Sequence, residues 1–177
     1  MKERIKALEC SSGDNPEHFS LPYRRGVGLM VINKEKNVFV GQRIDTKNDT
    51  WQMPQGGIKE DETVYEAGVR ELKEETNMVD VQIIAETKNW LYYDLPEFLI
   101  GKLWEGQYRG QKQKWLLMYF FGNDSTIDVK TSSAEFQKWQ WLDLSEIPEI
   151  VIPFKKHLYS SVVKEFHGII KDFQVPE

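Results

Sequence analysis

The segment from Thr63 to Asn77 constrains the fold most strongly, because the sequence shows both where a helix begins and where it ends. Thr63 and Glu66 form a T-x-x-E capping box, in which each side chain bonds to the backbone of the other residue. Asn77 tolerates the left-handed conformation that commonly ends a helix. Small and apolar residues recur at helical spacing in between and are expected to face the core: Val64, Ala67, Gly68 and Leu72.

Three glutamates share one face of this predicted helix, because Glu71, Glu74 and Glu75 are spaced at i, i+3 and i+4. Carboxylates this close repel one another by roughly a few tenths of a kcal/mol per pair when solvated, and by more when partly buried. A hard divalent cation such as Mg²⁺ would offset that repulsion, since it prefers oxygen ligands. A solvated charged face explains the same pattern, so the glutamates alone leave both interpretations open.

The segment before the helix is strand-like over residues 51–55 and then enters a double glycine, Gly56-Gly57. Glycine lets a backbone turn sharply and come close to a ligand. A carbonyl of this turn could therefore join the carboxylates around a metal ion. On its own, the double glycine is weak evidence for such a site.

Short β-branched and aromatic runs elsewhere predict the strands of a mixed or antiparallel sheet. The expected strands cover residues 27–32, 38–42, 81–93, 114–121 and 139–142, and the first two form a hairpin. A second amphipathic helix, with Pro153 at its first position, is expected to cover one face of the sheet. Residues 1–22 are polar and turn-prone and are interpreted as an N-terminal arm, whereas residues 23–175 form one domain.

The composition excludes several classes of function. The chain has 177 residues, 40% of them hydrophobic, which suits one domain, and its single cysteine and three histidines lack the spacing of a zinc site. It contains no apolar run of roughly 18–20 residues and no apolar N-terminal stretch, so we expect a cytoplasmic protein without a membrane partner. A net charge of −5 argues against DNA or other long nucleic acid held by electrostatics alone. The oligomeric state stays open.

Together the residues follow the pattern Gly56-x5-Glu62-x7-Arg70-Glu71-Leu72-x-Glu74-Glu75-x-Asn77-Met78. This pattern resembles the Nudix box, G-x5-E-x7-R-E-U-x-E-E-x-G-U, in which U is an aliphatic residue. Asn77 stands where the family has glycine, which is expected to be harmless because asparagine also accepts positive φ. Phrases such as Asn89-Trp-Leu-Tyr-Tyr-Asp-Leu-Pro96 are similar to the bacterial branch of RNA pyrophosphohydrolases and dinucleoside polyphosphate hydrolases.

The resemblance implies an α/β fold, the Nudix fold, with a mixed β-sheet in an α/β/α sandwich. It also implies hydrolysis within a polyphosphate chain with Mg²⁺ or Mn²⁺, two to three ions when substrate is bound. Glu71 or a second glutamate is the candidate base, and Arg70 with Glu62 is expected to brace the loop against the helix. The catalytic residues implied are Arg70, Glu71, Glu75 and Glu135. The metal ligands implied are the Gly56 carbonyl, Glu71, Glu74, Glu75 and Glu135.

The substrate contacts also follow from the resemblance. Five basic residues are assigned to phosphate groups: Arg24, Arg43, Lys112, Lys114 and Lys155. Lys112 and Lys114 share one strand face, because side chains alternate along a strand. Arg24 and Phe154 are expected to sandwich a nucleobase, and Tyr93 is a further candidate beside the phosphates. The alternatives are a solvated edge strand for the two lysines and ordinary core packing for Phe154. The other tryptophans of the strands are interpreted as core: Trp90, Trp115, Trp139 and Trp141.

The first functional hypothesis is therefore an enzyme that converts 5′-triphosphate RNA to 5′-monophosphate RNA, releases pyrophosphate and so initiates RNA decay. The same site would also split dinucleoside polyphosphates. One alternative is mainly a diadenosine tetraphosphate hydrolase that releases ATP, and a weaker one is a hydrolase of damaged nucleoside triphosphates. A further alternative, from another class, is a nucleotide-binding sensor without catalysis, which the complete set of box glutamates disfavours.

Overall fold

The computed structural model of the chain describes residues 20–44 and 50–176, and within them eight strands form one sheet. Its centre is the parallel pair β1 (Tyr23–Ile32) and β7 (Gly110–Phe120), in register from Tyr23↔Gly110 to Ile32↔Tyr119. The other strands are β2 (Val38–Arg43), β3 (Trp51–Gln52), β4 (Gln55–Gly57), β5 (Val81–Glu86), β6 (Leu91–Asp94) and β8 (Phe136–Leu142). They pair antiparallel, so the sheet is mixed, as expected.

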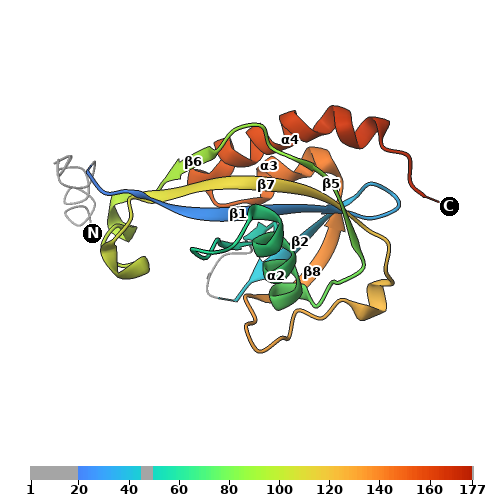
Figure 1. Cartoon of the computed structure of the whole chain (residues 1–177), viewed down its shortest axis with the longest axis horizontal. Helices are drawn as coiled ribbons and strands as arrows, with labels where there is room; N and C mark the ends of the chain where they lie inside the picture. Colours follow the sequence, from blue (N-terminus) through green and yellow to red (C-terminus); the bar gives the residue numbers. More distant parts are fainter. Residues whose placement is uncertain (1–19, 45–49, 177) are drawn as a thin grey trace, which may run out of the picture.

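Helices cover both faces of the sheet, which confirms the predicted α/β/α sandwich (Figure 1). One face carries α2 (Val64–Thr76), and the other carries α3 (Ile147–Ile150) and α4 (Lys156–Asp172). Short 3₁₀ turns occupy several connections: η1 (Glu97–Leu99), η2 (Trp104–Gly106), η3 (Asp124–Thr126), η4 (Leu144–Glu146) and η5 (Pro153–Lys155). None of the helices in the described ranges is long and apolar enough to cross a membrane.

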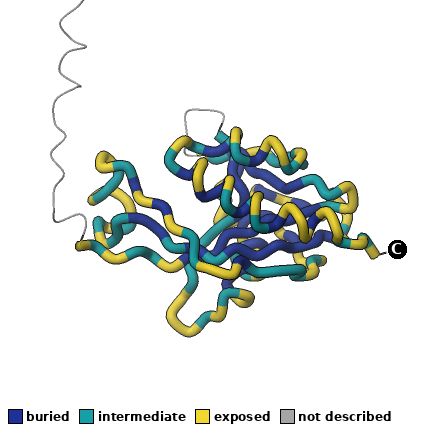
Figure 2. The backbone as a smooth tube through the Cα atoms, turned by 90° about the horizontal axis from the view of Figure 1, so that it is seen from above, coloured by how far each residue is buried: buried dark blue, intermediate teal, exposed yellow. Residues whose placement is uncertain are grey.

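The central strands supply two separate cores, because successive side chains of a strand point to opposite faces. Met30, Trp115 and Leu117 are buried under α4, whereas Leu29 and Leu116 are buried under α2. Figure 2 shows the buried backbone concentrated along the sheet and the exposed backbone on the outer elements. The same alternation decides which polar side chains of β1 and β7 point to each face.

The predicted limits of α2 are confirmed. Thr63 is the N-cap, and its capping box with Glu66 is complete: the Thr63 N–H donates to the Glu66 carboxylate at 2.9 Å, and the Glu66 N–H donates to the Thr63 hydroxyl at 3.2 Å. Asn77 is the C-cap, at φ 59°, and its N–H donates to the Lys73 carbonyl at 2.9 Å. Local signals therefore fixed this helix at both ends.

Several strand and helix boundaries differ from the expected ones. β1 begins at Tyr23 and β7 at Gly110, earlier than predicted, because the two strands pair with each other over this added length. The predicted strand 81–93 is two strands, β5 and β6. They are separated where Thr87 turns inward and exchanges hydrogen bonds of 2.9 and 3.0 Å with the Trp115 backbone. The final helix is preceded by the 3₁₀ turn η5, which Pro153 starts, and β8 begins at Phe136.

Two other predictions concern segments outside the cores. The expectation that Trp90 is a core residue is wrong, because Trp90 is half-buried and lies outside both cores. The Arg25 guanidinium carbon and the Lys112 ammonium nitrogen lie 5.8 and 5.5 Å from the centroid of its ring. Residues 1–19 of the predicted N-terminal arm lie outside the described residues. The arm and its role therefore stay a prediction.

The N-cap supports a stability prediction. Thr63→Ala removes the acceptor for the Glu66 N–H and should lower the free energy of unfolding by about 1 kcal/mol. The control is Ser160→Ala, because the exposed Ser160 hydroxyl donates to the Lys156 carbonyl of its own helix and makes no other hydrogen bond among the described residues, so its loss should be close to neutral. Urea unfolding of both variants measures the difference. Equal losses in the two variants would contradict the capping role.

Candidate active site

The predicted site residues converge on one cavity of about 520 Å³ at the start of β1. The residues from the predicted set that line it are Arg24, Arg43, Gly56, Glu71, Tyr93, Glu135, Phe154 and Lys155. The remaining members of the set do not line it: Arg70, Glu74, Glu75, Lys112 and Lys114. The cavity therefore joins a carboxylate end near α2 to a basic and aromatic wall near β6 and η5.

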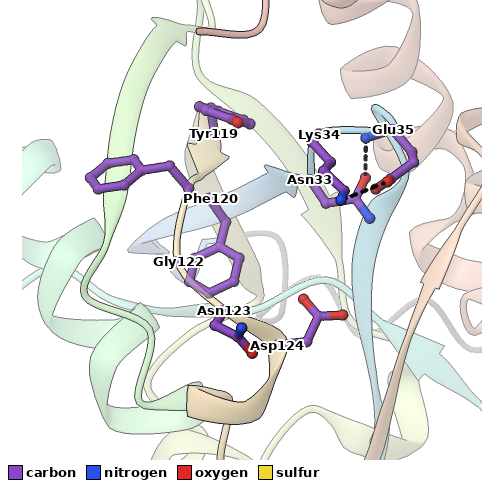
Figure 3. Close-up of a pocket in the computed structure, with 9 residues that line it drawn as sticks. Asn33, Lys34, Glu35, Tyr119, Phe120, Gly122, Asn123 and Asp124 are labelled. Atoms are coloured by element: carbon purple, nitrogen blue, oxygen red, sulfur yellow. Dashed lines mark hydrogen bonds and ion pairs between the residues drawn. The ribbon is translucent and has the colours of Figure 1, made fainter. Parts of the chain in front are cut away.

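A second hollow, of about 450 Å³, lies at the other end of β1 (Figure 3). It lies between the β1–β2 turn, where Asn33 accepts from the Glu35 N–H at 3.1 Å, and the segment after β7 that contains Asn123 and Asp124. The described residues that line it include none of the predicted site residues. We therefore place the candidate active site in the first cavity.

Arg70 braces the loop over residues 57–62 against α2. Its guanidinium donates to both carboxylate oxygens of Glu62, at 2.5 and 2.7 Å, and to the Gly57 carbonyl at 2.9 Å. It also donates to Glu71 at 2.7 Å. The hydrogen bonds that Glu62 accepts from Arg70 and from the Lys59 N–H lower the pKa of the Glu62 carboxyl to about 2. The predicted brace is therefore observed, and it holds the loop at the N-terminal half of the helix.

Gly56 brings the loop backbone directly against the Glu71 carboxylate. A Cβ atom placed on Gly56 would lie 1.9 Å from the Glu71 carboxyl carbon, so any other residue here would force the Glu71 carboxylate to move. The segment between β3 and β4 is held from both sides. Met53 donates its N–H to the Tyr159 hydroxyl of α4 at 2.9 Å, and the Pro54 carbonyl accepts from the Leu29 N–H at 2.9 Å.

Glu75 is unusual among the acidic residues of the site because its carboxyl group is buried. Its side chain is buried, and neither of its carboxylate oxygens has a hydrogen-bond partner among the described residues. Burial raises the pKa of the Glu75 carboxyl well above its ordinary value, and the charges of Glu135 and Glu71 raise it further. The Gln55 backbone amide and the charge of Arg43 act in the opposite direction and lower this pKa, although neither makes a hydrogen bond of standard geometry to Glu75. An unpaired buried carboxylate is costly.

These donors fit a divalent cation, although the side chains are not gathered into a finished metal site. Within the described ranges, no group of three histidine, cysteine or acidic side chains is arranged to hold a metal ion. Glu74 is exposed and accepts from Arg70 at 3.3 Å, and Glu135 lies 3.7 Å from Arg43. The Glu75 oxygens, which have no hydrogen-bond partner among the described residues, and the half-buried Glu71, which pairs with Arg70, nevertheless supply hard oxygen donors.

The opposite wall of the cavity carries cations and aromatic rings. Lys155 is buried; its ammonium group donates to the Gln55 amide oxygen at 3.2 Å and lies 5.1 Å from the Tyr93 ring centroid. The Tyr93 and Phe154 rings pack with their centroids 5.8 Å apart. Burial raises the pKa of the Tyr93 hydroxyl, so the phenol stays neutral.

Lys112 and Lys114 share one strand face, as predicted, but that face is turned away from the cavity. They alternate with Gln111, which lines the cavity, and with Gln113. Lys112 lies over the Trp90 ring, and Lys114 pairs with Glu86 at 3.0 Å. The parallel register with β1 places this face, and the assignment of the two lysines to phosphate groups stays a prediction.

The cavity residues that sequence reasoning missed include three glutamines and a tryptophan: Gln52, Gln55, Gln111 and Trp104. The glutamines had one usable signal. Gln111 and Gln113 occur at period two within a strand and are almost fully buried, and polar residues buried in a strand call for a specific role. Trp104 gave no comparable signal, because it lies in an irregular segment after β6.

Comparison with known proteins identifies the family. The NUDIX domain model matches residues 22–162. The chain belongs to the Nudix family. Similar curated proteins include the RNA pyrophosphohydrolase of Rickettsia africae (strain ESF-5), 51% identical over 160 residues that cover 90% of this chain and 99% of that protein. The RNA pyrophosphohydrolase of Rickettsia canadensis (strain McKiel) is 53% identical over 155 residues, 88% of this chain and 96% of the relative.

Solved structures share the Nudix fold. A C. elegans Ap4A hydrolase in a binary complex has a TM-score of 0.63 and 22% identity, covering 85% of this chain and 99% of its own. The E. coli dihydroneopterin triphosphate pyrophosphohydrolase has a TM-score of 0.63 and 19% identity, covering 81% and 98%. At these identities the likeness concerns the fold alone. Asn77, which replaces the glycine of the Nudix box, adopts φ 59°, so the substitution preserves the end of α2.

The burial of Glu75 supports a prediction for the metal-free protein. Its raised pKa means that, above pH 4.5, the native state binds more protons than the unfolded chain, so this residue makes stability fall as pH rises through that window. Glu75→Gln removes the charge and should raise stability at pH 7.5 by about 1 kcal/mol, or roughly 2–4 °C in Tm. The gain should shrink toward pH 4.5.

Thermal unfolding in EDTA at both pH values measures this effect. Glu74→Gln is the matched control, because Glu74 is 43% exposed and bonded to Arg70, and its replacement should not stabilise the protein. A Glu75→Gln variant that is no more stable than the unmodified protein at pH 7.5 would contradict the account of the buried charge.

Proposed function

We propose that this protein is a metal-dependent pyrophosphohydrolase that converts 5′-triphosphate RNA to 5′-monophosphate RNA and releases pyrophosphate. The observation that carries the proposal is the buried Glu75 carboxylate, whose oxygens have no hydrogen-bond partner among the described residues, beside Glu71, which lines one end of a cavity that also presents the cations Arg24, Arg43 and Lys155. A cation at the first end and a polyphosphate between the two ends would neutralise both. The near full-length likeness to RNA pyrophosphohydrolases supports RNA as the substrate.

The proposed metal ligands are the predicted ones: the Gly56 carbonyl, Glu71, Glu74, Glu75 and Glu135. Mg²⁺ or Mn²⁺, as two to three ions with substrate bound, would shield the phosphate charges and activate a water molecule. Glu71 pairs with Arg70, and the Arg43 charge acts on the buried Glu75 carboxyl. Glu74 and Glu135 would first have to leave Arg70 and Arg43.

The protein's own residues then position the substrate. Arg43 and Lys155 line the cavity and are proposed to hold the phosphate groups, because both are cations that face the same space as Glu71. Arg24 and Phe154 are proposed to contact the base. A glutamate orients or deprotonates the attacking water, and Glu71 is the first candidate because it lines the cavity while Glu75 lies buried behind it.

A second candidate function is hydrolysis of dinucleoside polyphosphates to release ATP. These molecules present the same polyphosphate attached to a nucleoside, so the same cavity serves both reactions. The two substrates differ only beyond the phosphates, in a chain of nucleotides or a second adenosine. The chain's fold is shared with an Ap4A hydrolase, which is compatible with this second activity.

A product assay tests the proposal. The protein is incubated with Mg²⁺ and either a short 5′-triphosphate RNA or diadenosine tetraphosphate at matched concentrations. Faster release of pyrophosphate from RNA supports the proposed function, and faster formation of ATP supports the second candidate. Absence of turnover with both substrates would leave a nucleotide-binding sensor as the better account.

The role of Glu71 gives a kinetic prediction. Glu71→Gln should lower kcat by at least about 100-fold, the range over which a positioned acid or base contributes. Glu60→Gln is the control, because Glu60 is exposed in the same loop and does not line the cavity; its kcat should stay within about twofold. Steady-state pyrophosphate release measures both. A Glu71→Gln enzyme with normal kcat would remove Glu71 from the catalytic set.

A further inference from the structure

The segment from η1 to η2 gives the cavity an apolar wall. Leu99, Leu103 and Trp104 line the cavity together with Arg24, and this segment projects beyond the start of β1 (Figure 1). Phosphate groups gain nothing from apolar surface, because they are anions that need donors and cations. This wall therefore faces an apolar, aromatic part of the ligand.

Trp104 covers the Arg24 guanidinium. The central carbon of the guanidinium lies 5.4 Å from the centroid of the indole ring. Arg24 is confined on another side by the loop, because a Cβ on Gly57 would lie 2.4 Å from one of its nitrogens. Tyr108 supports the indole edge-on, with centroids 6.3 Å apart. A planar cation below an aromatic ring is the arrangement that a nucleobase adopts when it stacks on arginine.

The backbone around Trp104 is held in an unfavourable conformation. Trp104 and Glu105 both have positive φ, at 50° and 57°, and neither is glycine. Gly101 and Gly106 on either side have φ of 86° and 73°. Such conformations persist where surrounding contacts impose them, and they concentrate in ligand clamps and switch regions. The contact with Arg24 is therefore made by a backbone that carries a conformational cost.

The gap between Trp104 and Arg24 is too small for a base. An aromatic ring inserted between them needs a contact of about 3.5 Å on each side, more than the observed 5.4 Å in total. Phe154, the expected partner of Arg24 in a sandwich, packs instead on Tyr93.

We propose that Trp104 is the movable wall of the nucleobase site and determines how tightly the enzyme binds the nucleoside end of its substrate. On binding, the indole moves away from Arg24 and the base stacks between the two groups. This inference rests on the proposed function, because it requires a ligand that joins a polyphosphate to a base.

Kinetics with a base-containing and a base-free ligand test the proposal. With a 5′-triphosphate dinucleotide as substrate, Trp104→Ala and Trp104→Leu should raise KM about tenfold, the order expected when one base–aromatic stack is lost, and should leave kcat within about twofold. Trp104→Phe should retain most of the affinity. Inhibition by inorganic tripolyphosphate, which has no base, should be unchanged in all variants.

The matched control is Phe98→Ala, because Phe98 belongs to the same segment, is 67% exposed and does not line the cavity. Melting temperatures show which variants are folded, and Trp104→Leu keeps a larger apolar side chain than alanine if Trp104→Ala does not fold. An unchanged KM in Trp104→Leu would overturn the inference, and so would a loss of tripolyphosphate affinity as large as the rise in KM. As long as the unmodified protein turns over its substrate, these results leave the proposed function intact. Absence of wild-type turnover would instead defeat the proposed function itself.

Discussion

The paired hydrogen bonds between Arg70 and Glu62 are the interaction on which the rest of the site depends. A guanidinium that binds both oxygens of a carboxylate fixes orientation as well as charge, and the remaining donors of Arg70 reach the Gly57 carbonyl and Glu71. The 57–62 loop is thereby fastened to α2. Because the loop is fixed, the backbone at Gly56 lies against the Glu71 carboxylate, and the two kinds of oxygen donor face the same cavity.

The site combines this rigid brace with a buried carboxylate that lacks a hydrogen-bond partner among the described residues. Arg70 pairs with the carboxylates of Glu62, Glu71 and Glu74. The Glu75 carboxylate is buried and accepts no hydrogen bond from the described residues. A protein that keeps a costly buried charge departs locally from the rules that stabilise folds, and such departures concentrate at functional sites. The cations of the opposite wall add the complementary half, so the cavity is prepared for a ligand that carries many negative charges and its own counter-ions.

The sequence predicted the parts of this arrangement that depend on local signals or on the Nudix box. The ends of α2 follow from Thr63, Glu66 and Asn77, which act within one turn of the helix. The facing of Lys112 and Lys114 could not be predicted, because it depends on the parallel register between β1 and β7, strands that are far apart in the chain. Trp104 was missed because its position depends on left-handed backbone conformations that only the packed structure imposes.

The central claim is that the buried carboxylate of Glu75, beside Glu71, holds a divalent cation. Calorimetric titration of the metal-free protein with Mn²⁺ at neutral pH, without substrate, tests it most directly when the unmodified protein is compared with Glu75→Gln. The account predicts binding to the unmodified protein, with release of protons, and at least about tenfold weaker binding to the variant, the scale of a lost metal-site contact. Equal affinity in the two proteins would contradict it.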